Sequence, residues 1–300
     1  MQDKVILFIL ALFSRLPLSF AQRVGKVLGW LAYKIPNKER RIAKINIATC
    51  LPELSELQRD ILLKDSMIES AKGVVEMPIV WASQPARWID LVIPGEGAGL
   101  FEKTISKGKG VIAVGPHLGN WEVGLHYLTS LAKVTAIYRP PRREVLDDLL
   151  KQGRGQGGAT LVPATPQGVK TLYGALKRGE MMALLADQQP KAAGRQGGNY
   201  APFFGHPALT MVLIGRLARK TGAPVLFWFM ERLPGARGYK MHWFRAPGGI
   251  DSDDPDITAA ALNQGLEQCI RHAPAQYLWS YKRFASQPDG VISPYSTIVS

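Results

Sequence analysis

The chain has few cysteines and lacks several motifs that identify common enzyme classes. Only two of its 300 residues are cysteine, Cys50 and Cys269, and they lie far apart. This excludes a disulfide framework and a cysteine-rich zinc site and is typical of a protein that faces the cytosol. No Gly-x-Ser-x-Gly elbow or His-Glu-x-x-His pair is present, and no Gly-x-Gly-x-x-Gly loop follows a predicted strand. The sequence therefore predicts neither a bound metal nor a cofactor.

Long apolar runs are absent as well. Residues 5–13 form an uninterrupted apolar run of nine residues, after which come Arg15 and Pro17. A helix that spans a bilayer needs about 20 apolar residues, so this segment is too short for a clear span. It resembles a weak signal peptide, but we expect monotopic insertion into a membrane surface rather than cleavage.

Acidic residues are scarce relative to basic ones. The chain has 37 Lys and Arg against 24 Asp and Glu, a net charge of +13, which favours an anionic partner or surface. Residues 1–44 alone hold nine basic and two acidic residues, interleaved with Leu, Ile, Phe and Trp. With no nucleic-acid-binding signature present, we expect no nucleic acid partner and predict instead contact with an anionic membrane.

The hydrophobic pattern predicts an α/β fold with a mainly parallel central sheet flanked by helices. From residue 91 onward, short apolar runs alternate with helical patterns, which is typical of such sheets. We expect three parts: membrane-associating N-terminal helices (1–36), a catalytic domain (37–285) and a loose C-terminal tail (286–300). The expected strands are 110–115, 134–139, 159–162, 181–186, 225–230 and a more exposed strand at 239–245.

The helix boundaries follow from caps and proline. Helical periodicity covers 55–77 and is expected to stop before Pro78. Thr165 followed by Pro166 predicts a capped helix start. Further helices are expected at 121–132, 145–152, 209–220 and 256–272, and a last strand or turn at 277–284.

His117 and Glu122 are the leading catalytic candidates. Residues five apart on one helix point about 140° away from each other, so they meet only if His117 precedes a helix that Glu122 begins. The strand at 110–115, followed by Gly and Asn, predicts this strand-turn-helix arrangement. A histidine with an orienting carboxylate is a suitable general base. The alternative is a hydrogen-bonded turn histidine and a glutamate favoured by the helix dipole.

Three further polar residues are candidates for binding the substrate. Asp187 could accept from a substrate hydroxyl or orient an arginine. Arg139 ends one strand, Asp187 ends another, and Arg154 lies in a glycine-rich segment (153–158) that we interpret as a flexible turn. Chemistry in parallel sheets gathers at the carboxyl ends of strands, and an arginine there can bind phosphate or carboxylate. The alternatives are solvated loop arginines and an ordinary turn acid. Without a protein nucleophile, the predicted base would deprotonate a hydroxyl of the substrate, which then attacks an activated acyl carbon, with arginine or glycine-rich backbone stabilising the oxyanion.

Several motifs in order along the chain resemble one known family. They are His117-Leu-Gly-Asn-Trp-Glu122, Tyr138-Arg-Pro140, Asp187-Gln188, Phe203-Phe-Gly205 with Ala208-x-Thr210, and Tyr277-Leu-Trp-Ser-Tyr-Lys-Arg-Phe284. This set is similar to that of the bacterial lipid A biosynthesis late acyltransferases (lauroyl and myristoyl transferases) within the lysophospholipid acyltransferase superfamily. The resemblance extends from about residue 41 to residue 284.

The resemblance implies an inner-membrane enzyme on the cytoplasmic face. It implies transfer of a fatty acyl group from acyl carrier protein to a hydroxyl of a membrane glycolipid, the lipid A precursor. His117 would be the base and Glu122 its orienting residue, while Arg154 and Asp187 match positions that the family conserves. The loop 190–200 departs from the family by its glycine content, so substrate selection there could differ.

Two other functions stay open at this stage. One is an acyltransferase of the same superfamily acting on another amphiphile, such as a lysophospholipid or an aminolipid. The chain lacks the Pro-Glu-Gly-Thr-Arg motif of glycerolipid acyltransferases, which argues against a glycerophosphate acceptor. The other is a non-catalytic membrane-binding homologue, against which the intact His117 and Glu122 count.

Overall fold

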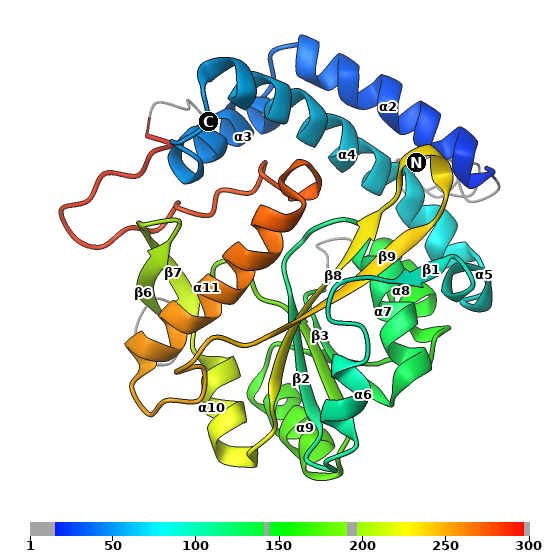
Figure 1. The fold of residues 1–300 in the computed structure, drawn as a ribbon, viewed down its shortest axis with the longest axis vertical. Coiled ribbons are helices and arrows are strands. Elements are labelled where there is room, and N and C mark those ends of the chain that lie inside the picture. The colour runs from blue at the N-terminus through cyan, green and yellow to red at the C-terminus, as the bar shows by residue number, and fades with distance from the viewer. Residues whose placement is uncertain (1–15, 141–143, 191–196, 297–300) are drawn as a thin grey trace.

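A seven-stranded sheet forms the centre of the molecule, with helices on both faces (Figure 1). The structure, a computed structural model, describes residues 16–140, 144–190 and 197–296. All neighbouring strands are parallel except β8 and β9, which are antiparallel. The expected mainly parallel sheet is confirmed. Across the sheet the strands are β1 (Val92–Pro94), β9 (Tyr239–Arg245), β8 (Val225–Arg232), β2 (Val111–Gly115), β5 (Met181–Leu185), β3 (Val134–Tyr138) and β4 (Thr160–Pro163).

The helices form two layers and a group that lies across the top of the sheet in Figure 1. One layer comprises α9 (Pro166–Lys177), α10 (Leu213–Thr221) and α11 (Pro255–His272). The other comprises α5 (Ala86–Ile89), α6 (Leu100–Ile105), α7 (Trp121–Leu131) and α8 (Glu144–Gly155). The group at the top comprises α2 (Leu18–Lys34), α3 (Lys38–Cys50) and α4 (Glu56–Ala82). Short 3₁₀ turns are η1 (Pro234–Ala236) and η2 (Pro274–Gln276), and a separate hairpin joins β6 (Gly198–Phe203) to β7 (His206–Met211).

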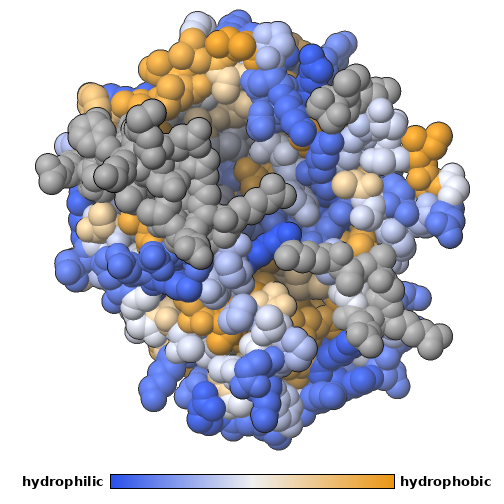
Figure 2. Space-filling model, turned by 180° about the vertical axis from the view of Figure 1, so that it is seen from behind, coloured by the Kyte–Doolittle hydropathy of each residue, from blue (hydrophilic) through white to orange (hydrophobic). Residues whose placement is uncertain are grey.

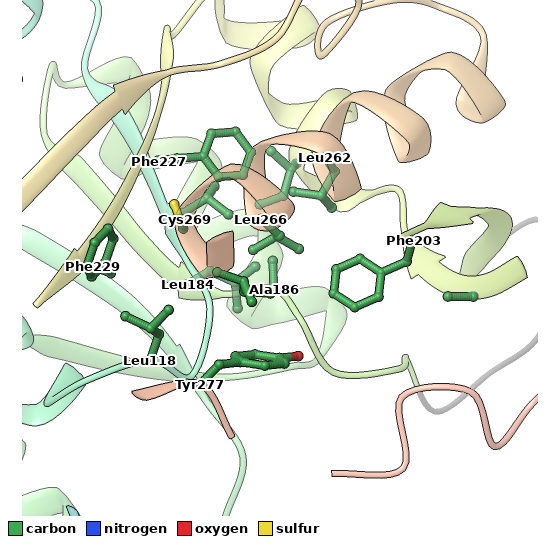
Figure 3. Packing of buried hydrophobic residues seen from close by; sticks show 14 of the residues in the cluster. Leu118, Leu184, Ala186, Phe203, Phe227, Phe229, Leu262, Leu266, Cys269 and Tyr277 are labelled. Atoms are coloured by element: carbon green, nitrogen blue, oxygen red, sulfur yellow. The ribbon is translucent and has the colours of Figure 1, made fainter. Parts of the chain in front are cut away.

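Two apolar cores lie on the two faces of the sheet. Every side chain of β2 is buried, as expected for a central parallel strand covered on both sides. Alternate residues of β8 divide between the cores: Phe227 packs with α11 and Trp228 with α7. Figure 3 shows the first core, where Phe227 faces Leu262 and Leu266 of α11.

Two boundaries differ from the predictions because tertiary contacts override local signals. The helix expected at 209–220 begins only at Leu213, since residues before it form β7 of the hairpin, which turns at Phe204 and Gly205 with positive φ angles. The apolar run there fits a helix or a strand, so periodicity could not decide. The helix expected to stop before Pro78 continues to Ala82, because Ile79 and Val80 are fully buried in the second core.

Strand β9 is less exposed than expected, and the C-terminal tail has one buried side chain among its described residues. Strand β9 is buried along most of its length, since helices cover both faces of the sheet at that edge. In the C-terminal tail, Tyr295 is buried in the first core, and its hydroxyl donates to the Asn46 side chain of α3. That hydroxyl also accepts the backbone N–H of Phe284. These contacts hold the tail against α3.

Helix α2 is packed on one face and apolar on the exposed one. Gly25 and Gly29 lie against α4, where a Cβ on Gly29 would come within 2.4 Å of the Ile68 Cα. Figure 2 shows apolar surface along the upper edge of the molecule, the end at which Figure 1 places α2. The exposed apolar side chains of this helix, named here the apolar face of α2, are Phe20, Val27, Leu28, Trp30 and Leu31. Among the helices of the described residues, none is both long and apolar enough to cross a membrane; residues 1–15 of the expected N-terminal segment lie outside that range.

A buried ion pair fastens α4 to the sheet beneath it. Arg232 at the end of β8 donates to both carboxylate oxygens of Glu76, and both side chains are almost fully buried. Glu76 also accepts from Gln22 of α2 and from Asn120, which precedes α7. One carboxylate thereby connects four segments of the chain.

Replacing Arg232 by Met should destabilise the fold strongly, because Glu76 is then left buried without its cation. We expect a loss of about 3–5 kcal/mol in the free energy of unfolding, measured by urea denaturation. In Arg232→Met/Glu76→Gln the uncompensated charge is gone while the amide still accepts hydrogen bonds, so part of the loss should be recovered. Equal stability of the single and double variants would contradict this account.

Candidate active site

The local structure around His117 is the predicted strand, turn and helix start. Strand β2 ends at Gly115, His117 follows in the turn, and α7 begins at Trp121. Gly119 has φ +67°, and a Cβ there would come within 1.8 Å of the Met230 carbonyl oxygen, so only glycine fits. The side chain of Asn120 caps α7 by accepting from the Val123 N–H.

The register of the sheet brings His117 to Asp187. Gly115 and Leu185 are direct partners in the parallel pair of β2 and β5, and His117 and Asp187 each lie two residues further on. Asp187, predicted to bind the substrate, therefore contacts the predicted base. The His117 Nδ1 and the Asp187 Oδ1 are 2.7 Å apart. Burial raises the pKa of Asp187, but the neighbouring His117 and hydrogen bonds to the carboxylate lower it by more, so this group stays ionised. An ionised Asp187 accepts from Nδ1–H, which leaves the lone pair on Nε2.

Glu122 lies at the start of α7 as predicted, but its contacts differ from the expectation. Its carboxylate accepts two hydrogen bonds from Arg154, at 2.6 and 2.9 Å, and one from the Trp81 indole. Burial raises the pKa of Glu122, and the charge and hydrogen bonds of Arg154 outweigh that effect, so the net shift is downward. The carboxylate that contacts the ring of His117 is therefore Asp187, and Glu122 holds an arginine.

The position of Arg154 corrects a second expectation. The segment 153–158 does not form a free turn at this residue, because α8 continues to Gly155 and includes Arg154 in its last turn. Gly153 is needed there for packing, since a Cβ would come within 2.4 Å of the Trp81 side chain. Helix α8 directs the guanidinium at Glu122. The prediction was a flexible turn that presents this group to a ligand.

One cavity gathers most of these residues, and we name it the active-site cavity. Its volume is about 260 Å³, and His117, Glu122, Arg139 and Arg154 all line it. Its apolar wall comes from α7, α8 and the strands: Leu125, Ala136, Ile137, Leu150, Ala183, Leu184, Leu185 and Trp228. Among the described residues that line it, none is a serine, threonine, cysteine or lysine. The cavity can thus receive an apolar chain beside an imidazole.

Two tryptophans complete the site. Trp121 stands edge-to-face on the His117 ring, with ring centroids 5.1 Å apart, and it also lines the cavity. The prediction did not include Trp81, which donates to Glu122. Its place could not be found from the sequence because the helix that carries it was expected to end before Pro78. Arg139 is exposed at the cavity mouth, as a strand-end residue should be.

A second cluster of ligand-type side chains lies away from this cavity. Glu231, His242 and His272 place their polar atoms within 4.8 Å of one another. The His242 Nδ1 accepts the Glu96 backbone N–H, so its proton is on Nε2, which donates to Glu231. With that tautomer neither ring nitrogen of His242 is free to bind a metal ion.

Comparison with known proteins shows that the chain is an acyltransferase and gives its family. The chain belongs to the bacterial lipid A biosynthesis acyltransferases, whose family match covers residues 3–286. It is 28% identical over 291 residues to the lipid A biosynthesis lauroyltransferase of Escherichia coli (strain K12), covering 96% of this chain and 92% of that one. It is 27% identical over 291 residues to the palmitoleoyltransferase of the same strain, with the same coverage. To the myristoyltransferase of that strain it is 26% identical over 284 residues, covering 93% and 85%.

The ion pair of Glu122 and Arg154 predicts a specific pH dependence of stability. Because the folded-state pKa of Glu122 is lowered, its stabilisation is complete above the unfolded pKa of about 4.3 and is lost as the pH falls through the folded value. Glu122→Gln should lower the free energy of unfolding by about 3 kcal/mol at pH 7. The difference from the unmodified protein should shrink toward zero below about pH 4. Urea denaturation followed by tryptophan fluorescence measures it, and a difference independent of pH would contradict the assignment.

Proposed function

We propose that this enzyme transfers a fatty acyl chain from acyl carrier protein to a hydroxyl of a lipid A precursor, with His117 as general base. The observation that carries the proposal is the 2.7 Å contact between the His117 Nδ1 and the Asp187 carboxylate at an apolar-walled cavity. The names of the relatives, which describe lauroyl, palmitoleoyl and myristoyl transfer in lipid A biosynthesis, support the acceptor and the acyl class.

The reaction needs one base that also serves as acid. The His117 Nε2 takes the proton of the acceptor hydroxyl while its oxygen attacks the thioester carbonyl. The imidazolium that forms is stabilised by the ionised Asp187. The tetrahedral intermediate then expels the carrier thiolate, the C–S bond breaks, and the imidazolium returns the proton to sulfur. The products are an ester and a free thiol.

The other site residues take roles around this step. Asp187 orients the His117 ring directly, and Glu122 holds the Arg154 guanidinium at the cavity wall. Arg139 at the mouth of the cavity is the cation available for the oxyanion or an anionic part of the substrate. The apolar wall from Leu125 to Trp228 would receive the acyl chain.

The charge and the apolar face of α2 support the location and the donor. A net charge of +13 steers an acidic carrier protein and anionic phospholipid toward the enzyme. The apolar face of α2 would lie in the interfacial region of the inner membrane, on its cytoplasmic side.

Removing the base or its orienting carboxylate should lower kcat sharply without unfolding the protein. For His117→Ala and Asp187→Asn we expect kcat with an acyl carrier protein donor to fall by about 10²–10⁴-fold, because the base or its correct tautomer is lost. His126→Gln, which alters another histidine on α7, serves as a control and should retain most of the activity. Near-normal kcat for purified His117→Ala would overturn the mechanism.

Mass spectrometry of lipid A from cells with and without the protein tests the acceptor. The number of acyl chains on lipid A should drop in cells that lack the protein.

Charged residues on the apolar face of α2 should release the protein from membranes. Leu28→Glu/Leu31→Glu puts two carboxylates where we expect contact with acyl chains, which disfavours insertion. The matched control is Ile257→Glu/Val291→Glu, which changes two exposed apolar side chains that do not belong to α2. Sedimentation with vesicles that contain anionic phospholipid measures the effect. Equal membrane binding by both double variants would place the membrane contact elsewhere.

A further inference from the structure

A second cavity with a basic lining lies between α2, α4 and the turn that joins β8 to β9. Its volume is about 350 Å³, and we name it the basic cavity. Its charged lining residues are Arg23, Lys26, Lys72, Arg232 and one carboxylate, Glu69. None of them belongs to the active-site cavity.

Two of the four cations in this cavity are already neutralised. Lys72 pairs with Glu69 at 2.5 Å, and Arg232 pairs with Glu69 and with Glu76. Within the described part of the chain, Arg23 and Lys26 make no ion pair, and both are exposed on α2. A phosphate monoester carries about −1.5 to −2 charges at neutral pH, which matches two open cations.

An apolar groove shares lining residues with both the basic cavity and the active-site cavity. This groove, of about 460 Å³, adjoins the basic cavity, and both are lined by Glu69 and Gln276. The groove also shares Trp121 with the active-site cavity, and Trp121 contacts the His117 ring. Its apolar lining consists of Ala32, Met67, Ala71, Val74, Met77, Trp121 and Leu278.

The basic cavity is lined by the same helix that carries the apolar face of α2. Arg23 and Lys26 are on the same helix as Phe20, Val27 and Trp30, whose apolar side chains are exposed. In a helix that lies in a membrane interface, cations beside the apolar face meet the phosphates of the lipids. A phosphate carried by a membrane amphiphile is therefore the anion that this geometry fits best.

We propose that the basic cavity binds a phosphate group of the acceptor glycolipid, through Arg23 and Lys26. The adjoining groove then takes an apolar part of the same molecule, and Trp121 leads to the reacting hydroxyl at His117. This inference rests on the proposed function, since it assigns the residues that would bind the phosphate of that acceptor. It assigns the two cations to recognition of one substrate, a role separate from general attraction to an anionic membrane.

The test compares two double variants with equal loss of charge on the same surface. Arg23→Ala/Lys26→Ala removes the open cations of the basic cavity, and Lys34→Ala/Lys38→Ala removes two exposed cations at the end of α2 and the start of α3, outside the cavity. With a phosphorylated acceptor we expect KM to rise by about tenfold or more in the first variant, with little change in kcat, and to stay near normal in the control. With the enzymatically dephosphorylated acceptor, the unmodified enzyme and the first variant should have the same raised KM.

Each contrary outcome has a distinct meaning. Equal KM increases in both double variants would show attraction to the bulk membrane and overturn the inference, as would an unchanged KM in the first variant. Inorganic phosphate could bind the basic cavity at millimolar concentration while dephosphorylation of the acceptor leaves KM unchanged. That result would identify a site for free phosphate and would also overturn the inference. If the unmodified enzyme acylates no lipid A precursor, the proposed function fails. Equilibrium binding of a short-chain phosphorylated glucosamine lipid to the enzyme and to the first variant then still decides the inference, because only the former should bind.

Discussion

The parallel pairing of β2 with β5 is the constraint on which the site depends. Since Gly115 and Leu185 are partners in register, the chain that leaves each strand carries His117 and Asp187 to neighbouring positions beyond the sheet. A shift of one residue would turn every side chain of the strand to the other face, and the fully buried sequence of β2 would lose its fit on both sides. The same apolar burial that stabilises the sheet therefore sets the geometry of the imidazole and its carboxylate.

The two carboxylates of the site have different partners. Asp187 is buried against the imidazole, and Glu122 is buried against a guanidinium and an indole, so each is held ionised by a different neighbour. The helix of Glu122 is itself fixed from the far side: Asn120 caps α7 and donates to Glu76, whose charge is balanced by Arg232. The buried pair at the end of β8 thus supports the turn that presents His117, although it lies outside the active-site cavity.

Much of this arrangement followed from local sequence signals, and the rest depended on contacts between distant segments. Strand β2, the turn at Gly119 and the start of α7 follow from an apolar run, a glycine and a capping asparagine. The partner of His117 could not follow from spacing, because Asp187 is 70 residues away and Glu122 is only five. The helical position of Arg154 and the contact of Trp81 were also missed, because local signals predicted that their helices end earlier. Glycine near Arg154 and proline at Pro78 are local signals to end a helix, and packing between α4, α7 and α8 overrides both.

The two outer strands of the sheet affect how readily molecules of this protein aggregate. β1 has three residues and β4 has four, and each ends at a proline, Pro94 and Pro163. An outer strand exposes unpaired backbone groups that can join another sheet, and short length and a residue without an N–H both limit such pairing. The two outer strands of this sheet therefore offer little opportunity for aggregation through its edges.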